Sequence, residues 1–132
     1  MAEYPEDRAY TTDHEWVTTG NDSIARVGIT DFAAEALGDV VFASMPELGD
    51  EVAAGDCVAE LESTKSVSEV FTPVSGIISR INEAVVEEPE MITSDPYDTG
   101  WLFEVEMSDQ AELEDLLDAE AYADHVDKAD KE

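Results

Sequence analysis

One lysine in the middle of the chain could do chemistry through its side-chain amine. Lys65 is the only lysine in residues 1–127, in a sequence that contains 34 acidic residues. A lysine amine on its flexible four-carbon stem can be acylated, which removes its charge and extends the reach of the side chain. Because a surface lysine in so acidic a chain could have been replaced by glutamate, its isolation favours a modified lysine that carries an arm.

Direct catalysis by Lys65 fits the sequence less well. A Schiff-base lysine needs a desolvated pocket, whereas Glu60, Glu62 and Glu69 place negative charge on both sides of this lysine. The single cysteine, Cys57, has no histidine or second cysteine near it in sequence, so we interpret it as a small half-buried side chain. We therefore expect no catalytic residue and no metal site.

An arm-bearing lysine has to stand at an exposed position, and the sequence around Lys65 predicts a β-hairpin. Val58–Glu62 and Val67–Phe71 have the composition of strands, and only four residues separate them. A connection of this length places its central residues at the exposed tip. We expect Lys65 at that tip, sterically open on all sides.

The remainder of the chain predicts a mainly β fold with short helices. Glycine, proline, aspartate and asparagine separate short segments rich in Val, Ile and Phe. Further strands are expected at residues 16–18, 23–29, 40–43, 77–81 and 101–107, and we expect the strand at 40–43 to be buried.

Two helices are expected. Thr30 or Asp31 can cap a short helix that Gly38 ends. Near the C-terminus, Asp109 and Glu112 match a capping box, and the apolar side chains that follow have helical spacing. The residues expected to face the sheet are Leu113, Leu116 and Leu117, with Tyr122 and Val126 as further candidates. We expect one domain over residues 1–132, with a core at about 8–124 and a frayed acidic tail at 125–132.

The charge of the chain excludes two classes of partner. Six basic residues against 34 acidic ones give a net charge of −28. So few cations cannot neutralise the phosphates of a nucleic acid or an anionic membrane surface. No stretch reaches the roughly 18 apolar residues that a membrane span needs, and the N-terminus does not resemble a signal peptide. We expect a soluble cytoplasmic protein, and like-charge repulsion favours a monomer.

The acidic residues are spread along the chain and not gathered in one tail. Residues 106–132 hold 11 of the 34, so the first 105 residues hold the other 23. At molar salt the Debye length falls to about 3 Å and most of the resulting repulsion is screened. The composition therefore predicts adaptation to a salt-rich cytoplasm, as in extreme halophiles, and loss of structure at low salt.

The segment Glu62–Val67, followed by Pro73–Gly76, resembles the modification hairpin of lipoyl and biotinyl carrier domains. Other segments resemble the H-protein family of the glycine cleavage system, and the resemblance covers roughly residues 8–124. Thr64, Ser66 and Val67 depart from the residues usual in that family, but the lysine stays central. The segments that carry the resemblance are His14–Val17, Gly28–Ala33, Ala36–Phe42, Asp95–Tyr97, Gly100–Trp101 and Asp109–Tyr122.

This resemblance implies a fold and a role. The fold is a flattened sandwich of two antiparallel sheets, the lipoyl/biotinyl-carrier hybrid motif, with short helices at one edge and at the C-terminus. The role is that of a carrier with lipoic acid attached covalently to Lys65. The carrier itself is non-catalytic, because the cofactor supplies the group-transfer chemistry. The hairpin residues that a lipoylating enzyme would recognise are Glu62, Ser63, Thr64 and Ser66.

The resemblance also implies three partner enzymes. A pyridoxal-phosphate glycine decarboxylase would load an aminomethyl group, and a tetrahydrofolate-dependent aminomethyltransferase would remove it. Dihydrolipoyl dehydrogenase, with FAD and NAD, would reoxidise the arm. The loaded arm ends in a cationic amine and should lie in a groove that excludes water and offers a carboxylate. The positions that match the groove of the family are Asp13, Glu15 and Glu69.

Three alternatives stay open at the level of the sequence. The chain could be a relay that donates lipoyl groups to the carriers of 2-oxoacid dehydrogenases. It could be a lipoyl domain of such a dehydrogenase, although the His14–Val17 segment argues against this. It could also be an acidic β-domain whose Lys65 is never modified. The route of loading, by ligation of free lipoate or by octanoyl transfer, is equally open.

Overall fold

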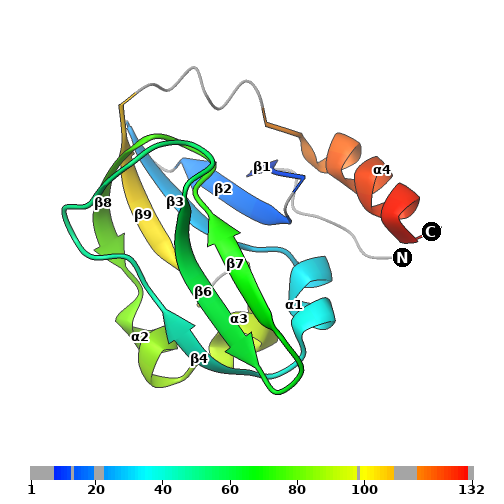
Figure 1. The fold of residues 1–132 in the computed structure, drawn as a ribbon. Helices are drawn as coiled ribbons and strands as arrows, with labels where there is room; N and C mark the ends of the chain where they lie inside the picture. The colour runs from blue at the N-terminus through cyan, green and yellow to red at the C-terminus, as the bar shows by residue number, and fades with distance from the viewer. Residues whose placement is uncertain (1–7, 13, 20–22, 98, 109–115, 131–132) are drawn as a thin grey trace.

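The computed structural model describes residues 8–12, 14–19, 23–97, 99–108 and 116–130. Its strands form two antiparallel sheets that pack face to face, as Figure 1 shows. The larger sheet has the order β1-β2-β3-β9-β8-β5, and the smaller has the order β4-β6-β7. The strands are β1 (Ala9–Tyr10), β2 (Glu15–Thr19), β3 (Ile24–Ile29), β4 (Val40–Ser44), β5 (Glu51–Val52), β6 (Cys57–Ser63), β7 (Val67–Phe71), β8 (Gly76–Ile81) and β9 (Phe103–Met107).

The core lies between the two sheets because alternate side chains of each strand point inward. In the larger sheet, Val27 of β3 and Val105 of β9 are fully buried. In the smaller sheet, Leu61 of β6 and Val70 of β7 are buried. Their neighbours Glu60, Glu62 and Glu69 along the strands are exposed and face outward. This arrangement confirms the mainly β sandwich that the sequence predicts.

Strand β4 corrects the expectation of a buried strand at 40–43. Val40 and Ala43 are buried, but Val41 and Phe42 are 56% and 54% exposed. The pairing of β4 with β6 shifts between Val40 and Phe42, as at a β-bulge. A bulge interrupts the alternation of faces, so two neighbouring apolar side chains both reach the surface.

Three short helices lie near the sheets, namely α1 (Asp31–Leu37), α2 (Glu83–Glu87) and α3 (Met91–Ser94). Thr30 caps α1, since its side chain accepts a hydrogen bond from the Ala33 N–H. Gly38 ends α1 with a φ of 78°, a backbone conformation that favours glycine. Helices α2 and α3 were not expected from the sequence, because one or two turns leave too short a pattern.

The C-terminal helix α4 runs over Ala119–Asp130, so Leu116 and Leu117, which the spacing places in a helix, lie outside it. Its first turn is capped by Asp118, whose Oδ1 accepts a 2.8 Å hydrogen bond from the Ala121 N–H. Leu116 and Leu117 precede the helix, and Leu117 forms a backbone bridge with Tyr10 of β1. Asp109, Glu112 and Leu113 lie outside the described residues. The helix continues to Asp130, where the sequence suggested a frayed tail.

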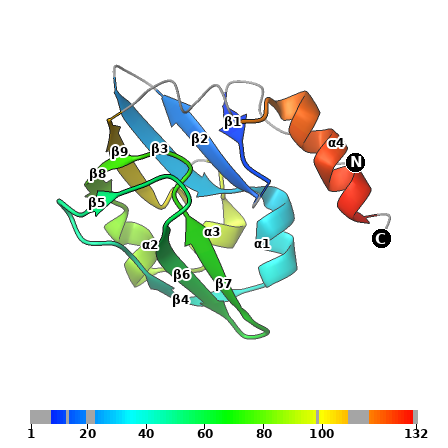
Figure 2. The same ribbon diagram turned by 45° about the horizontal axis from the view of Figure 1, so that its top comes forward.

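Tyr122 and Val126 are the side chains of α4 that become buried. The Tyr122 ring stacks on Tyr10, with ring centroids 4.8 Å apart, and its hydroxyl lies 2.7 Å from Thr30 Oγ1. Figure 2 shows α4 beside β1, at the edge of the larger sheet. None of the helices in the described ranges is long and apolar enough to cross a membrane.

Candidate functional site

Lys65 lies at the exposed tip of the β6–β7 hairpin, as the sequence predicts. Ser63 organises this tip. Its Oγ accepts hydrogen bonds from the Lys65 and Ser66 N–H groups, at 3.1 and 3.0 Å, and donates one to the Ser66 carbonyl. Neither Thr64 nor Lys65 has a positive φ, so the turn is not of the primed types that suit two-residue hairpins. The hydrogen bonds of the Ser63 hydroxyl stabilise this turn instead.

The corner between α1 and β4 supports the tip, so Lys65 is not open on all sides. The Thr64 N–H donates a 3.3 Å hydrogen bond to the Asp39 carbonyl. The Lys65 stem lies over Gly38, because a Cβ at Gly38 would stand 2.8 Å from Lys65 Cε and 3.4 Å from Nζ. Gly38 and Asp39 therefore belong to the site, although their sequence indicated only the end of a helix.

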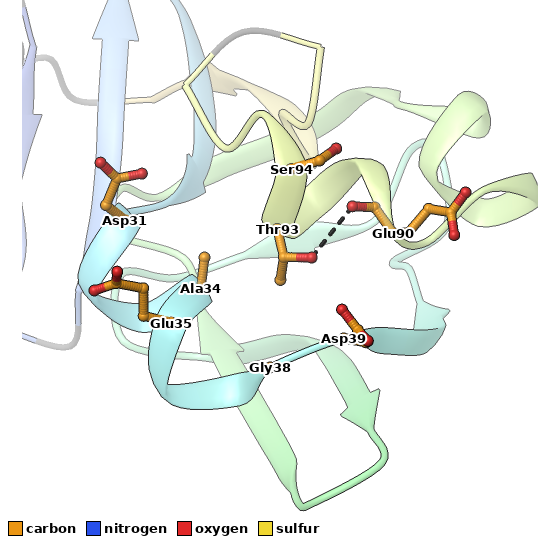
Figure 3. Close-up of a pocket in the computed structure, with 8 residues that line it drawn as sticks. All are labelled: Asp31, Ala34, Glu35, Gly38, Asp39, Glu90, Thr93 and Ser94. Carbon is orange, nitrogen blue, oxygen red and sulfur yellow. Dashed lines mark hydrogen bonds between the residues drawn. The ribbon is translucent and has the colours of Figure 1, made fainter.

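A pocket of about 670 Å³ opens between α1 and α3, next to this corner (Figure 3). Its α1 side carries Asp31, Glu35 and Asp39, and its α3 side carries Glu90. Burial, and then the neighbouring Glu35 carboxylate, raise the pKa of Asp31. Within the described residues, no group of three or more His, Cys, Asp or Glu side chains is arranged to hold a metal ion.

The predicted groove residues are placed in different surroundings. Glu15, on β2, is only 2% exposed; its Oε2 accepts a 2.7 Å hydrogen bond from the Phe71 N–H and its Oε1 accepts one from Thr11. Glu15 therefore ties the larger sheet to β7, two residues beyond Glu69. Glu69 itself is exposed and pairs across the sheet with Glu60. Asp13 lies outside the described residues.

Cys57 is exposed and not in a disulfide, rather than half-buried as expected. Partial desolvation raises the pKa of its thiol, and the Glu69 carboxylate adds to the shift through a hydrogen bond and its charge. A raised pKa leaves less of the thiolate, which is the nucleophile. The surroundings of Cys57 therefore agree with its interpretation as an unreactive side chain.

His14 packs at the start of β2, as expected of a residue at a strand edge. It is the one non-glycine residue in the described ranges with a positive φ, at 70°. Its Nδ1 lies 2.7 Å from the Tyr122 hydroxyl, and its ring packs against Phe32. The backbone of His14 is held from both sides, because its N–H donates to the Thr11 carbonyl and its carbonyl accepts from the Thr30 N–H.

These contacts define what the site can do. The Lys65 side chain is exposed on a fixed turn, and none of the ion pairs found in the described part of the chain involves its amine. An amine so placed can enter the active site of another protein and be acylated there. This exposed position differs from the desolvated surroundings of a Schiff-base lysine.

Comparisons with known proteins agree with this geometry. Residues 8–129 match the family model described as glycine cleavage H-protein. A glycine cleavage system H protein of Micrococcus luteus is 51% identical over 127 residues, which cover 96% of this chain and 99% of the relative. One of Marinobacter nauticus is 50% identical over 126 residues, which cover 96% of this chain and 97% of the relative.

A solved structure extends the similarity to the fold. The crystal structure of a glycine cleavage system H protein from Mycobacterium marinum superposes with a TM-score of 0.85 at 44% sequence identity. The superposition covers 94% of this chain and 99% of that chain. The two sheets, the short helices and the C-terminal helix are thus the architecture of a known protein.

Proposed function

The chain belongs to the glycine cleavage H-protein family, and from this membership we propose that it is a non-catalytic lipoyl carrier with lipoic acid attached to Lys65. The exposed tip of the β6–β7 hairpin is the observation that carries the proposal. When bound, the lipoyl group supplies a disulfide that accepts a one-carbon fragment together with electrons.

The residues present fit such a group. Formation of an amide at Lys65 requires an accessible amine on a turn that keeps its conformation when the modifying enzyme binds. The three hydrogen bonds of Ser63 and the bond from Thr64 to Asp39 hold the turn. The work of the chain is to present this amine, and later the arm, at a fixed distance from the sandwich.

We assign the arm three partners in turn. They are glycine decarboxylase with pyridoxal phosphate, the tetrahydrofolate-dependent aminomethyltransferase, and dihydrolipoyl dehydrogenase with FAD and NAD. A free, exposed Cys57 suits a reducing compartment, which supports a cytoplasmic location. The net charge of −28 supports a monomer, since copies repel each other.

The cargo of the carrier ends in an amine, which a carboxylate would stabilise away from water. We propose that it rests beside β7 at the exposed Glu69, with Asp13 as a further contributor and with the buried Glu15 holding β7 in place through the Phe71 N–H. The pocket between α1 and α3 is the alternative resting place. Glu69→Gln should speed the hydrolytic release of formaldehyde and ammonia from the loaded carrier, whereas Glu35→Gln should not; the reverse result would favour the pocket.

The attachment is tested by mass. Protein from its native cells should carry one lipoyl increment, and peptide mapping should place it on Lys65. Lys65→Arg should abolish glycine–bicarbonate exchange with glycine decarboxylase while the circular dichroism spectrum stays unchanged. Exchange that survives in Lys65→Arg would contradict the carrier role, and a biotin increment would point to carboxylases.

The relay function needs a separate measurement. Lipoylated protein would be incubated with an unmodified lipoyl domain of a 2-oxoacid dehydrogenase and a lipoyl-transferring enzyme. Transfer of the increment, followed by mass, would add a relay role to that of glycine cleavage.

A further inference from the structure

The outer face of the smaller sheet carries two exposed apolar side chains, on either side of a glutamate, in the row next to the Lys65 turn. Phe42 of β4 pairs with Glu62 of β6, and Glu62 pairs with Val67 of β7. Cross-strand partners share a face, so these three side chains form one row, which we call the tip row. Phe42 is 54% exposed and Val67 is 58% exposed.

The bulge in β4 enlarges this apolar surface. Without the shift between Val40 and Phe42, strand alternation would turn one of Val41 and Phe42 toward the core. Both are instead more than half exposed, on an edge strand of a strongly acidic protein. Large apolar side chains that a bulge moves to the surface cost solubility, and such features occur at functional surfaces.

Negative charge accompanies the tip row. Glu62 stands in its centre, and the next row across the same face contains Ser44, Glu60 and Glu69. An arginine or lysine complements this pattern, because its aliphatic stem covers apolar side chains while its cationic head reaches the carboxylates. The face thus matches a protein surface with an apolar patch and basic side chains.

We propose that the tip row is the docking surface for the enzyme that attaches the lipoyl group to Lys65, through such an apolar and basic patch. The inference rests on the proposed function and extends it to a surface outside the Lys65 turn. The length of the Lys65 side chain favours the attaching enzyme over the later partners as the protein that binds the tip row. The unmodified side chain is shorter than the lipoylated one by the whole acyl chain, so the attaching enzyme has to approach the turn more closely than any later partner.

The test is lipoylation of the unmodified chain by a lipoate–protein ligase with lipoate and ATP, followed by intact mass. Phe42→Thr combined with Val67→Thr keeps residues that favour strands and should raise KM for the chain at least about tenfold, with kcat unchanged. Ile77→Thr is the matched control, since Ile77 is an apolar strand residue, 44% exposed, in the other sheet. It should leave both constants unchanged.

A second pair of variants covers the case in which the double variant does not fold. Glu62→Lys should raise KM by opposing the basic patch, and Glu51→Lys, the same charge change on β5, should not. Binding is read separately from turnover: Lys65→Arg protein, which accepts no lipoyl group, should inhibit lipoylation of the wild type. The same protein with Phe42→Thr and Val67→Thr should inhibit much more weakly.

Unchanged KM and unchanged inhibition in these variants would overturn the proposal. The carrier function would still stand in that case, provided that the wild type is lipoylated. An effect confined to reactions of the already lipoylated protein would assign the row to a later partner. Self-association of the wild type that the double variant loses would assign it to a second copy of the chain. A wild type that neither the lipoate ligase nor an octanoyl-transferring enzyme modifies would remove the carrier function as well.

Discussion

Glycine at position 38 is required by two independent features of the site. Its φ of 78° and ψ of −154° form a combination open essentially to glycine alone. Its missing side chain also leaves the space across which the Lys65 stem lies. The end of one helix thereby sets where a lysine of a different element can stand.

Gly38→Ala should therefore impair lipoylation beyond its effect on stability. Strain of this kind costs about 1–3 kcal/mol, and Gly55→Ala is the matched control, since Gly55 has a φ of 94° and a Cβ there would meet no atom within 4 Å. Both variants should lose stability in urea unfolding. Only Gly38→Ala should lower kcat/KM for lipoylation, by roughly fivefold, which corresponds to about 1 kcal/mol. Equal lipoylation of the two would show that the Lys65 stem does not depend on the corner.

The thiol of Cys57 reports on the carboxylates beside it. Desolvation first, and then Glu69 and Glu60, raise its pKa, so less thiolate is present at a given pH in the folded chain than in the unfolded one. The folded state therefore gains relative stability below the unfolded pKa and loses it as the pH rises toward the folded pKa. Alkylation by iodoacetamide follows the thiolate.

We expect the alkylation rate of Cys57 to rise at higher pH in the folded protein than in urea. Glu69→Gln should move the rise part of the way back, because desolvation remains, whereas Glu106→Gln in the other sheet should not move it. Coincident pH profiles of the folded and unfolded chains would contradict the effect. The rate is followed by mass on the intact protein.

At the scale of elements, the β6–β7 hairpin was predictable from sequence and its support was not. Alternation between Ala59 and Leu61 inward and Glu60 outward is a local pattern, as is the short turn. The contact between Thr64 and Asp39 joins segments that are distant in sequence, and no local pattern records it. Two-residue strands such as β1 could not be predicted from the sequence for the same reason, since they form only by pairing with a neighbouring strand.

The predicted C-terminal helix is present as α4, but Leu116 and Leu117 lie before it. The leucine spacing extends the predicted helix over Leu116 and Leu117, yet Leu117 forms backbone hydrogen bonds to Tyr10 and precedes α4. What docks α4 is instead Tyr122, whose hydroxyl lies 2.7 Å from both Thr30 Oγ1 and His14 Nδ1. This hydroxyl connects α4 to the cap of α1 and to His14, the residue before β2.

Tyr122→Phe should destabilise the fold by about 1–3 kcal/mol, because it removes a buried hydroxyl from two polar partners. The free energy of unfolding is measured by urea titration at constant salt. A double-mutant cycle with Thr30→Val isolates the contact, and the two changes should cost less together than the sum of the single losses. Strict additivity would show that the hydroxyl and Thr30 are not coupled.

At the scale of the whole molecule, repulsion among the acidic residues is the main electrostatic contribution to stability. Arg26 and Arg80 both lie against Glu104, at 2.8 and 4.0 Å, so two of the six basic residues serve a single buried carboxylate. The outer face of the smaller sheet even places Glu60 directly opposite Glu69. Like charges in such pairs destabilise a sheet unless they are screened, and screening depends on the solvent.

The melting temperature should therefore rise steeply with salt. In dilute buffer the Debye length is about 30 Å and repulsion acts across the molecule, whereas at 1 M it is about 3 Å and only contacting charges interact. Circular dichroism at increasing KCl should show structure lost at low salt and regained at molar salt. Sucrose at matched osmolarity separates screening from solvent exclusion, because it strengthens burial without screening charge. A protein fully folded in dilute buffer, with a melting temperature insensitive to KCl, would contradict adaptation to high salt and would mean that the core tolerates a charge of −28 unaided.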